Sequence, residues 1–169
     1  MKVCDLGTGT GAIAIALAKE RPNWHITAID IQPGALAIAS ANARRIKCHN
    51  IEFVCSNWFS KIPTKHFDLI ISNPPYIDAK DEHLSQGDVQ HEPKKALVSD
   101  YQGLSDLHHL IRESKKHLHP QGLLILEHGH QQQQQVLDFM QQHDLHNISG
   151  HLDEEQNQRF CIGYASHPH

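Results

Sequence analysis

The stretch from Lys2 to Lys19, KVCDLGTGTGAIAIALAK, decides the fold of this 169-residue chain. Its apolar start, Lys2 to Leu6, predicts a short buried strand that runs directly into glycines. The segment from Gly11 to Lys19, rich in Ala, Ile and Leu, predicts a helix. A strand, a glycine-rich turn and a helix in this order indicate the start of an α/β fold.

The same alternation of strand and helix patterns continues along the chain. Further strands are predicted at His25–Ile31, Ile51–Cys55, Phe67–Ser72, Leu123–Glu127, Asn147–Gly150 and Phe160–Tyr164. Further helices are predicted at Gly34–Ile46, Leu104–Leu118 and Gln131–His143, with a turn at Pro120-Gln121-Gly122. This order favours a mainly parallel sheet, in which ligands bind at the carboxyl ends of the strands.

Composition and charge narrow the class of protein. The length suits one domain, and a hydrophobic fraction of 39% suits a folded core. A formal net charge of −4 argues against a strongly basic nucleic-acid surface. We find no apolar run of the ~20 residues that a membrane helix needs and no secretory signal, so we expect a cytoplasmic protein. Cys4, Cys55 and Cys161 lie in apolar runs and are predicted to be buried thiols.

The sixteen histidines have no spacing that is typical of a metal site. We therefore predict no bound metal and expect the histidines at the surface.

The glycine loop predicts a nucleoside cofactor. Glycines let the backbone approach a ligand, and Asp30, at the end of the second strand, can accept hydrogen bonds from a ribose. Gly7, Gly9 and Ala12 also fit the dinucleotide pattern G-x-G-x-x-G/A, so the loop alone leaves NAD open. Asp5, just before the glycines, suits the ammonium group of S-adenosylmethionine better than a pyrophosphate.

The tetrapeptide Asn73-Pro74-Pro75-Tyr76, directly after the fourth strand, indicates methylation of a planar nitrogen. The lone pair of such a nitrogen is delocalised, so it must be held toward the methyl donor. The side-chain oxygen of Asn73 and the main-chain carbonyl of Pro74 can accept its two N–H hydrogens. The prolines stiffen the loop, and Tyr76 offers a flat apolar face.

At these residues the sequence resembles the release-factor glutamine methyltransferases, the HemK/PrmC family. The similar segments are DLGTGTGAIAIALA from Asp5, SNWF from Ser56, ISNPPYIDA from Ile71, the stretch Gly87 to Leu104, and LEHG from Leu126. The resemblance implies transfer of a methyl group from S-adenosylmethionine to the N5 atom of a glutamine in peptide chain release factors. It also implies a Rossmann-like class I methyltransferase fold with a mostly parallel seven-stranded sheet and an antiparallel last strand.

Site residues follow from the chemistry and the resemblance together. Asn73, Pro74 and Tyr76 are expected at the reacting amide. The expected cofactor-binding residues are Asp5, Gly7, Thr8, Gly9, Gly11, Asp30, Asn57, Trp58 and Asn73. Pro75 and Glu92 are the expected substrate contacts, although Glu92 serves equally well as an anchor of its segment. Asn57 departs from the family, which usually has Asp there.

We expect residues 1–169 to form one catalytic domain with a substrate-side insertion at 78–103, and the family's helical N-terminal domain to be absent. The expected partner is the glutamine-bearing loop of a release factor, bound by a monomer without direct contact to nucleic acid or membrane. Two alternatives stay open: an adenine-N6 nucleic-acid methyltransferase, and a fragment that folds without turnover.

Overall fold

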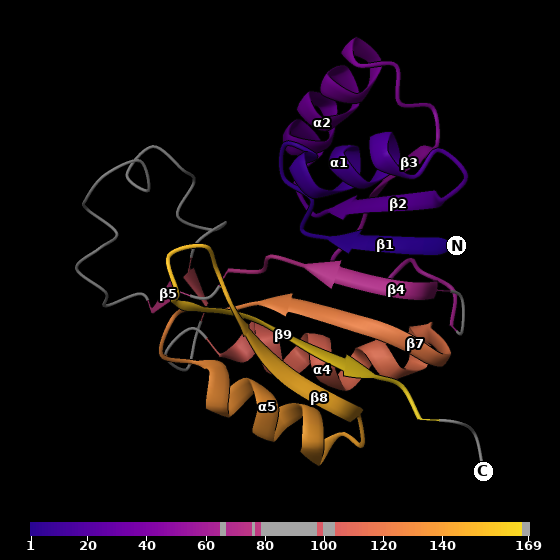
Figure 1. Cartoon of the computed structure of the whole chain (residues 1–169). Coiled ribbons are helices and arrows are strands. Elements are labelled where there is room, and N and C mark those ends of the chain that lie inside the picture. Colours follow the sequence, from indigo (N-terminus) through magenta and orange to yellow (C-terminus); the bar gives the residue numbers. More distant parts are fainter. Residues whose placement is uncertain (65–66, 76, 79–97, 100–103, 167–169) are drawn as a thin grey trace.

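The computed structural model describes residues 1–64, 67–75, 77–78, 98–99 and 104–166. A seven-stranded sheet in the order β3-β2-β1-β4-β7-β9-β8 forms the centre of the protein (Figure 1). Its strands are β1 (Lys2–Leu6), β2 (His25–Asp30), β3 (Ile51–Cys55), β4 (Phe67–Ser72), β7 (Leu118–Glu127), β8 (His146–Leu152) and β9 (Gln158–Tyr164). The helices are α1 (Ala12–Glu20), α2 (Pro33–Arg45), α4 (Ser105–His117) and α5 (Gln133–Gln142). Two short strands, β5 (Ile77–Asp78) and β6 (Val98–Ser99), pair separately.

Strand directions confirm the predicted fold class. Neighbouring strands from β3 through β7 are parallel, whereas β9 pairs antiparallel with both β7 and β8. The last strand in the chain therefore runs against the others, as the resemblance implied.

The turn predicted at Pro120-Gln121-Gly122 is wrong. These residues lie inside β7, which begins at Leu118. Backbone pairing holds them in the sheet: Gln121 N–H donates to the carbonyl of Ala165, and Ala165 N–H donates to the carbonyl of Gly122. Gln121 has φ 62, so the turn signal appears as a local irregularity within the strand.

Helices cover the two halves of the sheet differently. Helices α1 and α2 contact β2 and β3, while α4 and α5 contact β7, β8 and β9 (Figure 1). The apolar residues form two clusters. The smaller includes Val3 and Ile26 with Ala14 of α1, and the larger includes Leu126 with Leu110 of α4. Burying apolar groups on both faces makes the sheet a rigid base for the loops at its edge.

The carboxyl ends of four adjacent strands meet at one edge of the sheet. Leu6, the last residue of β1, pairs with Ile29 of β2 and with Ser72 of β4. Asp30, the last residue of β2, pairs with Cys55 at the end of β3. The residues that follow these strands are consequently neighbours in space.

Two expectations about surface and core are corrected. Cys55 is exposed rather than buried, because it lies at the end of the edge strand β3. His117 and His128 are buried rather than at the surface. His117 stacks on Phe59 with ring centroids 4.3 Å apart, and the burial of His128 lowers the pKa of its imidazole.

Candidate active site

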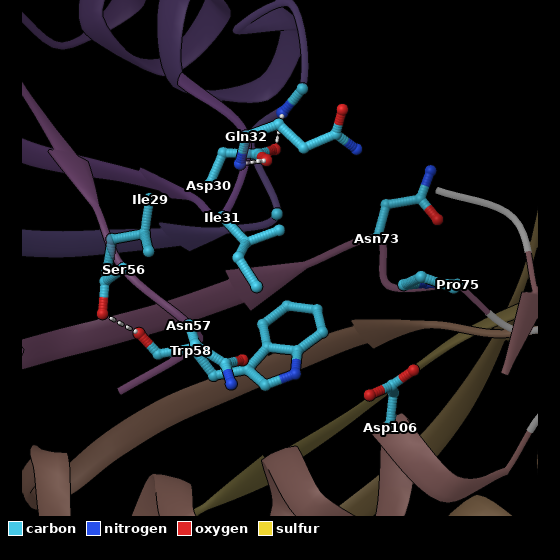
Figure 2. A pocket seen from close by; sticks show the side chains of 12 residues that line it. Ile29, Asp30, Ile31, Gln32, Ser56, Asn57, Trp58, Asn73, Pro75 and Asp106 are labelled. Atoms are coloured by element: carbon cyan, nitrogen blue, oxygen red, sulfur yellow. Dashed lines mark hydrogen bonds between the residues drawn. The ribbon is translucent and has the colours of Figure 1, made fainter. Parts of the chain in front are cut away.

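A cavity of about 400 Å³ opens at the edge where β1, β2, β3 and β4 end (Figure 2). Its size falls in the range of small-molecule sites. The lining residues are Gly7, Gly9, Ile29, Asp30, Ile31, Gln32, Ser56, Asn57, Trp58, Asn73, Pro75 and Asp106. The cavity therefore joins the glycine loop to the segment that begins at Asn73.

The glycine loop turns sharply between β1 and α1. Gly7, Gly9 and Gly11 have φ values of 71, 55 and 87, a region that side chains disfavour. A Cβ on Gly11 would lie 2.9 Å from Ile15 Cδ1 and 3.0 Å from Ala39 Cβ, so this glycine lets α1 pack closely on α2. The loop is thus shaped by backbone conformation that only glycine adopts readily.

Asp5 supports this loop from behind. The residue is 1% exposed, and its Oδ2 accepts hydrogen bonds from Thr8 Oγ1 at 2.6 Å and from Ala14 N–H at 3.2 Å. It therefore caps α1, whose own N-cap, Gly11, has no side chain for this role. Burial raises the pKa of Asp5 to about 6, although both hydrogen bonds oppose this rise. Among the described residues, the buried Oδ1 of Asp5 has no hydrogen-bond partner.

Asp30 closes the opposite side of the glycine loop. Its Oδ2 accepts a hydrogen bond from Gly9 N–H at 2.9 Å, and its Oδ1 accepts one from Gln32 N–H at 2.8 Å. Thr8 N–H also donates to the carbonyl of Ile29 at 2.8 Å. The half-buried carboxylate is therefore fixed in place, with lone pairs left for a ligand.

A tight turn after β3 presents Trp58 to the cavity. Ser56 Oγ donates to the carbonyl of Trp58 at 3.0 Å and accepts a hydrogen bond from Lys61 N–H at 3.2 Å. Trp58 has φ 45, which is unfavourable for a bulky side chain and is common at functional sites. Its indole lies beside Gly7, where a Cβ would be 3.4 Å from the ring. Figure 2 shows this indole in the middle of the cavity lining.

The loop after β4 brings an amide to the same cavity. Ser72 is buried, and its Oγ donates to the carbonyl of Leu6 at 2.7 Å, which ties the ends of β4 and β1 together. Asn73 follows directly and is exposed, whereas Pro74 is buried and Pro75 half-buried. The amide of Asn73 is therefore presented by an anchored, proline-stiffened segment.

The structure brings together seven of the predicted site residues: Gly7, Gly9, Asp30, Asn57, Trp58, Asn73 and Pro75. Asp5, Thr8, Gly11 and Pro74 are not lining residues, and the first three shape the glycine loop. Tyr76 and Glu92 lie outside the described residues.

Sequence reasoning assigned no role to five lining residues: Ile29, Ile31, Gln32, Ser56 and Asp106. Ile29, Ile31 and Gln32 lie next to Asp30 in the chain, so the prediction of Asp30 as a site residue could have pointed to them. Ser56 precedes Asn57 and was quoted only as part of a similar segment. Asp106 comes from α4, and no local pattern marked it.

The described residues also bear on the metal and membrane expectations. They contain no group of three or more His, Cys, Asp or Glu side chains arranged to hold a metal ion. Across the same residues, none of the helices has the length and apolar character of a membrane span.

The chain belongs to a methyltransferase family: the family described as "Methyltransferase domain" matches residues 1–160. Among curated proteins, it is 46% identical over 162 residues to a protein from Salmonella typhimurium named "Release factor glutamine methyltransferase". Proteins of the same name from Shewanella oneidensis and Escherichia coli are each 44% identical. These matches cover 96% of this chain but only 57–58% of the relatives, and they confirm the predicted resemblance.

Solved structures support the fold. A methyltransferase from Pyrococcus furiosus superposes with a TM-score of 0.73 at 16% identity, covering 98% of this chain and 75% of that one. A ribosomal protein L11 methylase from Lactobacillus delbrueckii subsp. bulgaricus gives 0.70 at 19% identity, covering 98% of this chain and 70% of that one. The class I methyltransferase fold predicted from the sequence is confirmed.

Proposed function

We propose that this chain is the catalytic domain of an enzyme that transfers a methyl group from S-adenosylmethionine to the side-chain amide nitrogen of a glutamine in peptide chain release factors. One observation carries the proposal: Asn73 and Pro75 open onto the same cavity as Gly7, Gly9 and Asp30. A cofactor cradle and an amide-holding segment thus face each other. The printed names of the relatives support the choice of acceptor.

The residues of the cavity fit S-adenosylmethionine. Asp30 would accept hydrogen bonds from the ribose hydroxyls, and Asn57 and the Trp58 indole would hold the adenine. The turn at Gly7 and Gly9 leaves room for the amino-acid part because no side chains project there. When bound, this cofactor supplies an electrophilic methyl group on a positively charged sulfur.

The acceptor side of the site works by positioning. Asn73 Oδ1 would accept one N–H of the glutamine amide, and the main-chain carbonyl of Pro74 would accept the other. Holding both hydrogens turns the nitrogen lone pair toward the methyl group. Positioning of this kind can supply up to about 7–11 kcal/mol of barrier reduction. The hydrogen bond from Ser72 Oγ to the carbonyl of Leu6 contributes because it fixes the position from which the segment beginning at Asn73 starts.

Labelled methyl transfer tests this function. The 169-residue chain is incubated with methyl-labelled S-adenosylmethionine and a peptide chain release factor, and tryptic peptides are analysed by mass spectrometry. We expect label on one glutamine and none on a release factor in which that glutamine is replaced by alanine. Label on single-stranded DNA instead would favour the adenine-N6 alternative. Cofactor binding without transfer to any release factor would favour the alternative of a fragment that folds without turnover.

A further inference from the structure

Asp106 is a carboxylate on the acceptor side of the cavity. It lies in the first turn of α4 and is half-buried. Within the described part of the chain, it is the only lining residue that comes after Pro75. Figure 2 shows Asp30 and Asp106 on opposite sides of the Trp58 indole, with Asp106 on the side of Pro75.

Among the described lining residues of the cavity, every charged side chain is acidic. These residues include the carboxylates of Asp30 and Asp106 and no Lys, Arg or His. The oxygens of Asp30 accept hydrogen bonds from the backbone of Gly9 and Gln32, so that carboxylate also holds the loops together. Asp106 brings its negative charge from a different element, on the side where the methyl group must be delivered. A cavity lined in this way attracts a cation.

We propose that Asp106 is a specificity-determining residue that makes the cavity bind S-adenosylmethionine more tightly than the product S-adenosylhomocysteine. This inference rests on the proposed function. The methyl group must reach an amide held by Asn73, so the sulfur of the cofactor lies on the side that Asp106 lines. The two ligands differ at this sulfur by one methyl group and one positive charge.

The proposed preference follows from the charge balance of the reaction. The S–C bond breaks with its electron pair left on sulfur, and the nitrogen lone pair forms the new N–C bond. The amide nitrogen then releases a proton to solvent. A carboxylate beside the sulfur therefore attracts the ligand before transfer and loses this attraction afterwards, which favours release of the product.

An ordinary structural role for Asp106 makes a different prediction. An acidic residue in the first turn of a helix stabilises the helix through its dipole. Loss of that stabilisation would alter the shape of the cavity and weaken both ligands alike. The ratio of the two affinities therefore separates the proposed role from the structural one.

Isothermal titration calorimetry of the 169-residue chain with each ligand provides the test. We expect Asp106→Asn to weaken S-adenosylmethionine about three- to tenfold, the scale of one lost charge interaction in a partly solvated site. Binding of S-adenosylhomocysteine should stay unchanged, and Asp106→Glu should keep most of the preference. Asp138→Asn is the matched control, because Asp138 is exposed on α5 and its replacement changes the net charge equally.

Far-UV circular dichroism and thermal unfolding check that the variants fold, and Asp106→Ser replaces any variant that does not. Equal weakening of both ligands, or no change in either, overturns the role of Asp106 and leaves the proposed function intact. A wild-type chain that binds neither ligand would remove the proposed cofactor and this inference with it.

Discussion

The two ends of the cavity use their polar side chains differently. At the glycine-loop end, which we call the cofactor end after its proposed ligand, Asp5 and Asp30 accept hydrogen bonds from the protein itself, including those from Gly9 and Gln32. At the end formed by Asn73 and Pro75, which we call the acceptor end after its proposed substrate, Asn73 is exposed, and the described residues give its side-chain amide no hydrogen-bond partner. The cofactor end is held by hydrogen bonds within the protein, whereas the acceptor end exposes the amide of Asn73.

This difference indicates which interactions hold the residues of each end in position. The cofactor end is formed by the loops after β1, β2 and β3, and hydrogen bonds to Asp5 and Asp30 hold the first two of these loops in place. In the part of the chain that the structure describes, the acceptor end is anchored by the prolines and by the hydrogen bond from Ser72 Oγ to the carbonyl of Leu6. At an exposed position, a polar group that lacks a protein partner costs little free energy, because water can bind to it, and it remains available for a substrate. Substitutions at the two ends should therefore change different measurements.

The largest effect is expected at the acceptor end. We expect Asn73→Ala to slow methyl transfer about 100- to 1000-fold, the cost seen when one preorganised hydrogen-bonding group is removed from an active site. The affinity for S-adenosylmethionine should change less than about threefold, because the cofactor end keeps its own braces. Single-turnover transfer to the release factor and calorimetry measure the two quantities.

Asn23→Ala, in an exposed turn after α1, is the control for Asn73→Ala and should leave both quantities unchanged. If Asn73→Ala abolished cofactor binding as well, the division of the cavity into two independent ends would be wrong.

The second effect is a pH dependence of the free energy of unfolding, which comes from the burial of the Asp5 carboxyl. Burial raises the pKa of this carboxyl from 3.8 to about 6 in the folded protein. Between these values the folded state holds a proton that the unfolded chain has released, so stability falls as the pH rises through this window. A shift of about two units corresponds to at most ~3 kcal/mol. Asp5→Asn should remove this dependence.

Urea unfolding at pH 4.5 and 7.5 measures the free energy of unfolding of wild type and of Asp5→Asn, and the difference between the two proteins is compared at the two pH values. The free energy of unfolding of the variant, relative to wild type, should be higher at pH 7.5 than at pH 4.5. Parallel profiles for the two proteins would mean that Asp5 is not desolvated as the structure indicates.

The third effect separates backbone strain from packing in the glycine loop. Gly11→Ala places a Cβ 2.9 Å from Ile15 Cδ1 at φ 87 and should lower the free energy of unfolding by about 2 kcal/mol. Gly9→Ala meets no atom within 4 Å but has φ 55, so we expect a loss of about 1 kcal/mol. Gly34→Ala is the control: it lies in the first turn of α2, has open space and should be neutral or slightly stabilising.

Chemical unfolding of the three glycine variants provides the ranking. Equal losses for Gly11→Ala and Gly9→Ala would show that the close packing of α1 on α2 contributes nothing beyond backbone conformation.

Much of this architecture could be predicted from the sequence because chain position and spatial position coincide at the ends of strands. β1, β3 and β4 have the predicted bounds, since each is an apolar run interrupted on both sides. Gly7 and Asn73 follow two of these strands, Asp30 ends β2, and parallel pairing places the three residues together. The site residues found by local pattern are of this kind.

What local pattern missed depends on tertiary contacts. The start of β7 was misplaced because pairing with the residues around Ala165 overrides the turn tendency of Pro120-Gln121-Gly122. Asp106 reaches the cavity only because α4 packs on β7, which no motif within the helix indicates. Trp58 was expected at the site, but its positive φ could not be read from its neighbours.

The smallest effect is expected at Asn57, where the chain departs from the family it resembles. Aspartate at this position would accept a stronger, charge-assisted hydrogen bond from the adenine amino group, but the site is exposed and the gain should be small. We expect Asn57→Asp to tighten binding about twofold, and equally for S-adenosylmethionine and S-adenosylhomocysteine, because both carry the same adenine. Calorimetry with the two ligands measures this. Asp106→Asn should change the ratio of the two affinities, whereas Asn57→Asp should not. If Asn57→Asp tightened S-adenosylmethionine alone, a negative charge would act on the sulfur from any position in the cavity. The two ends would then not be electrostatically separate.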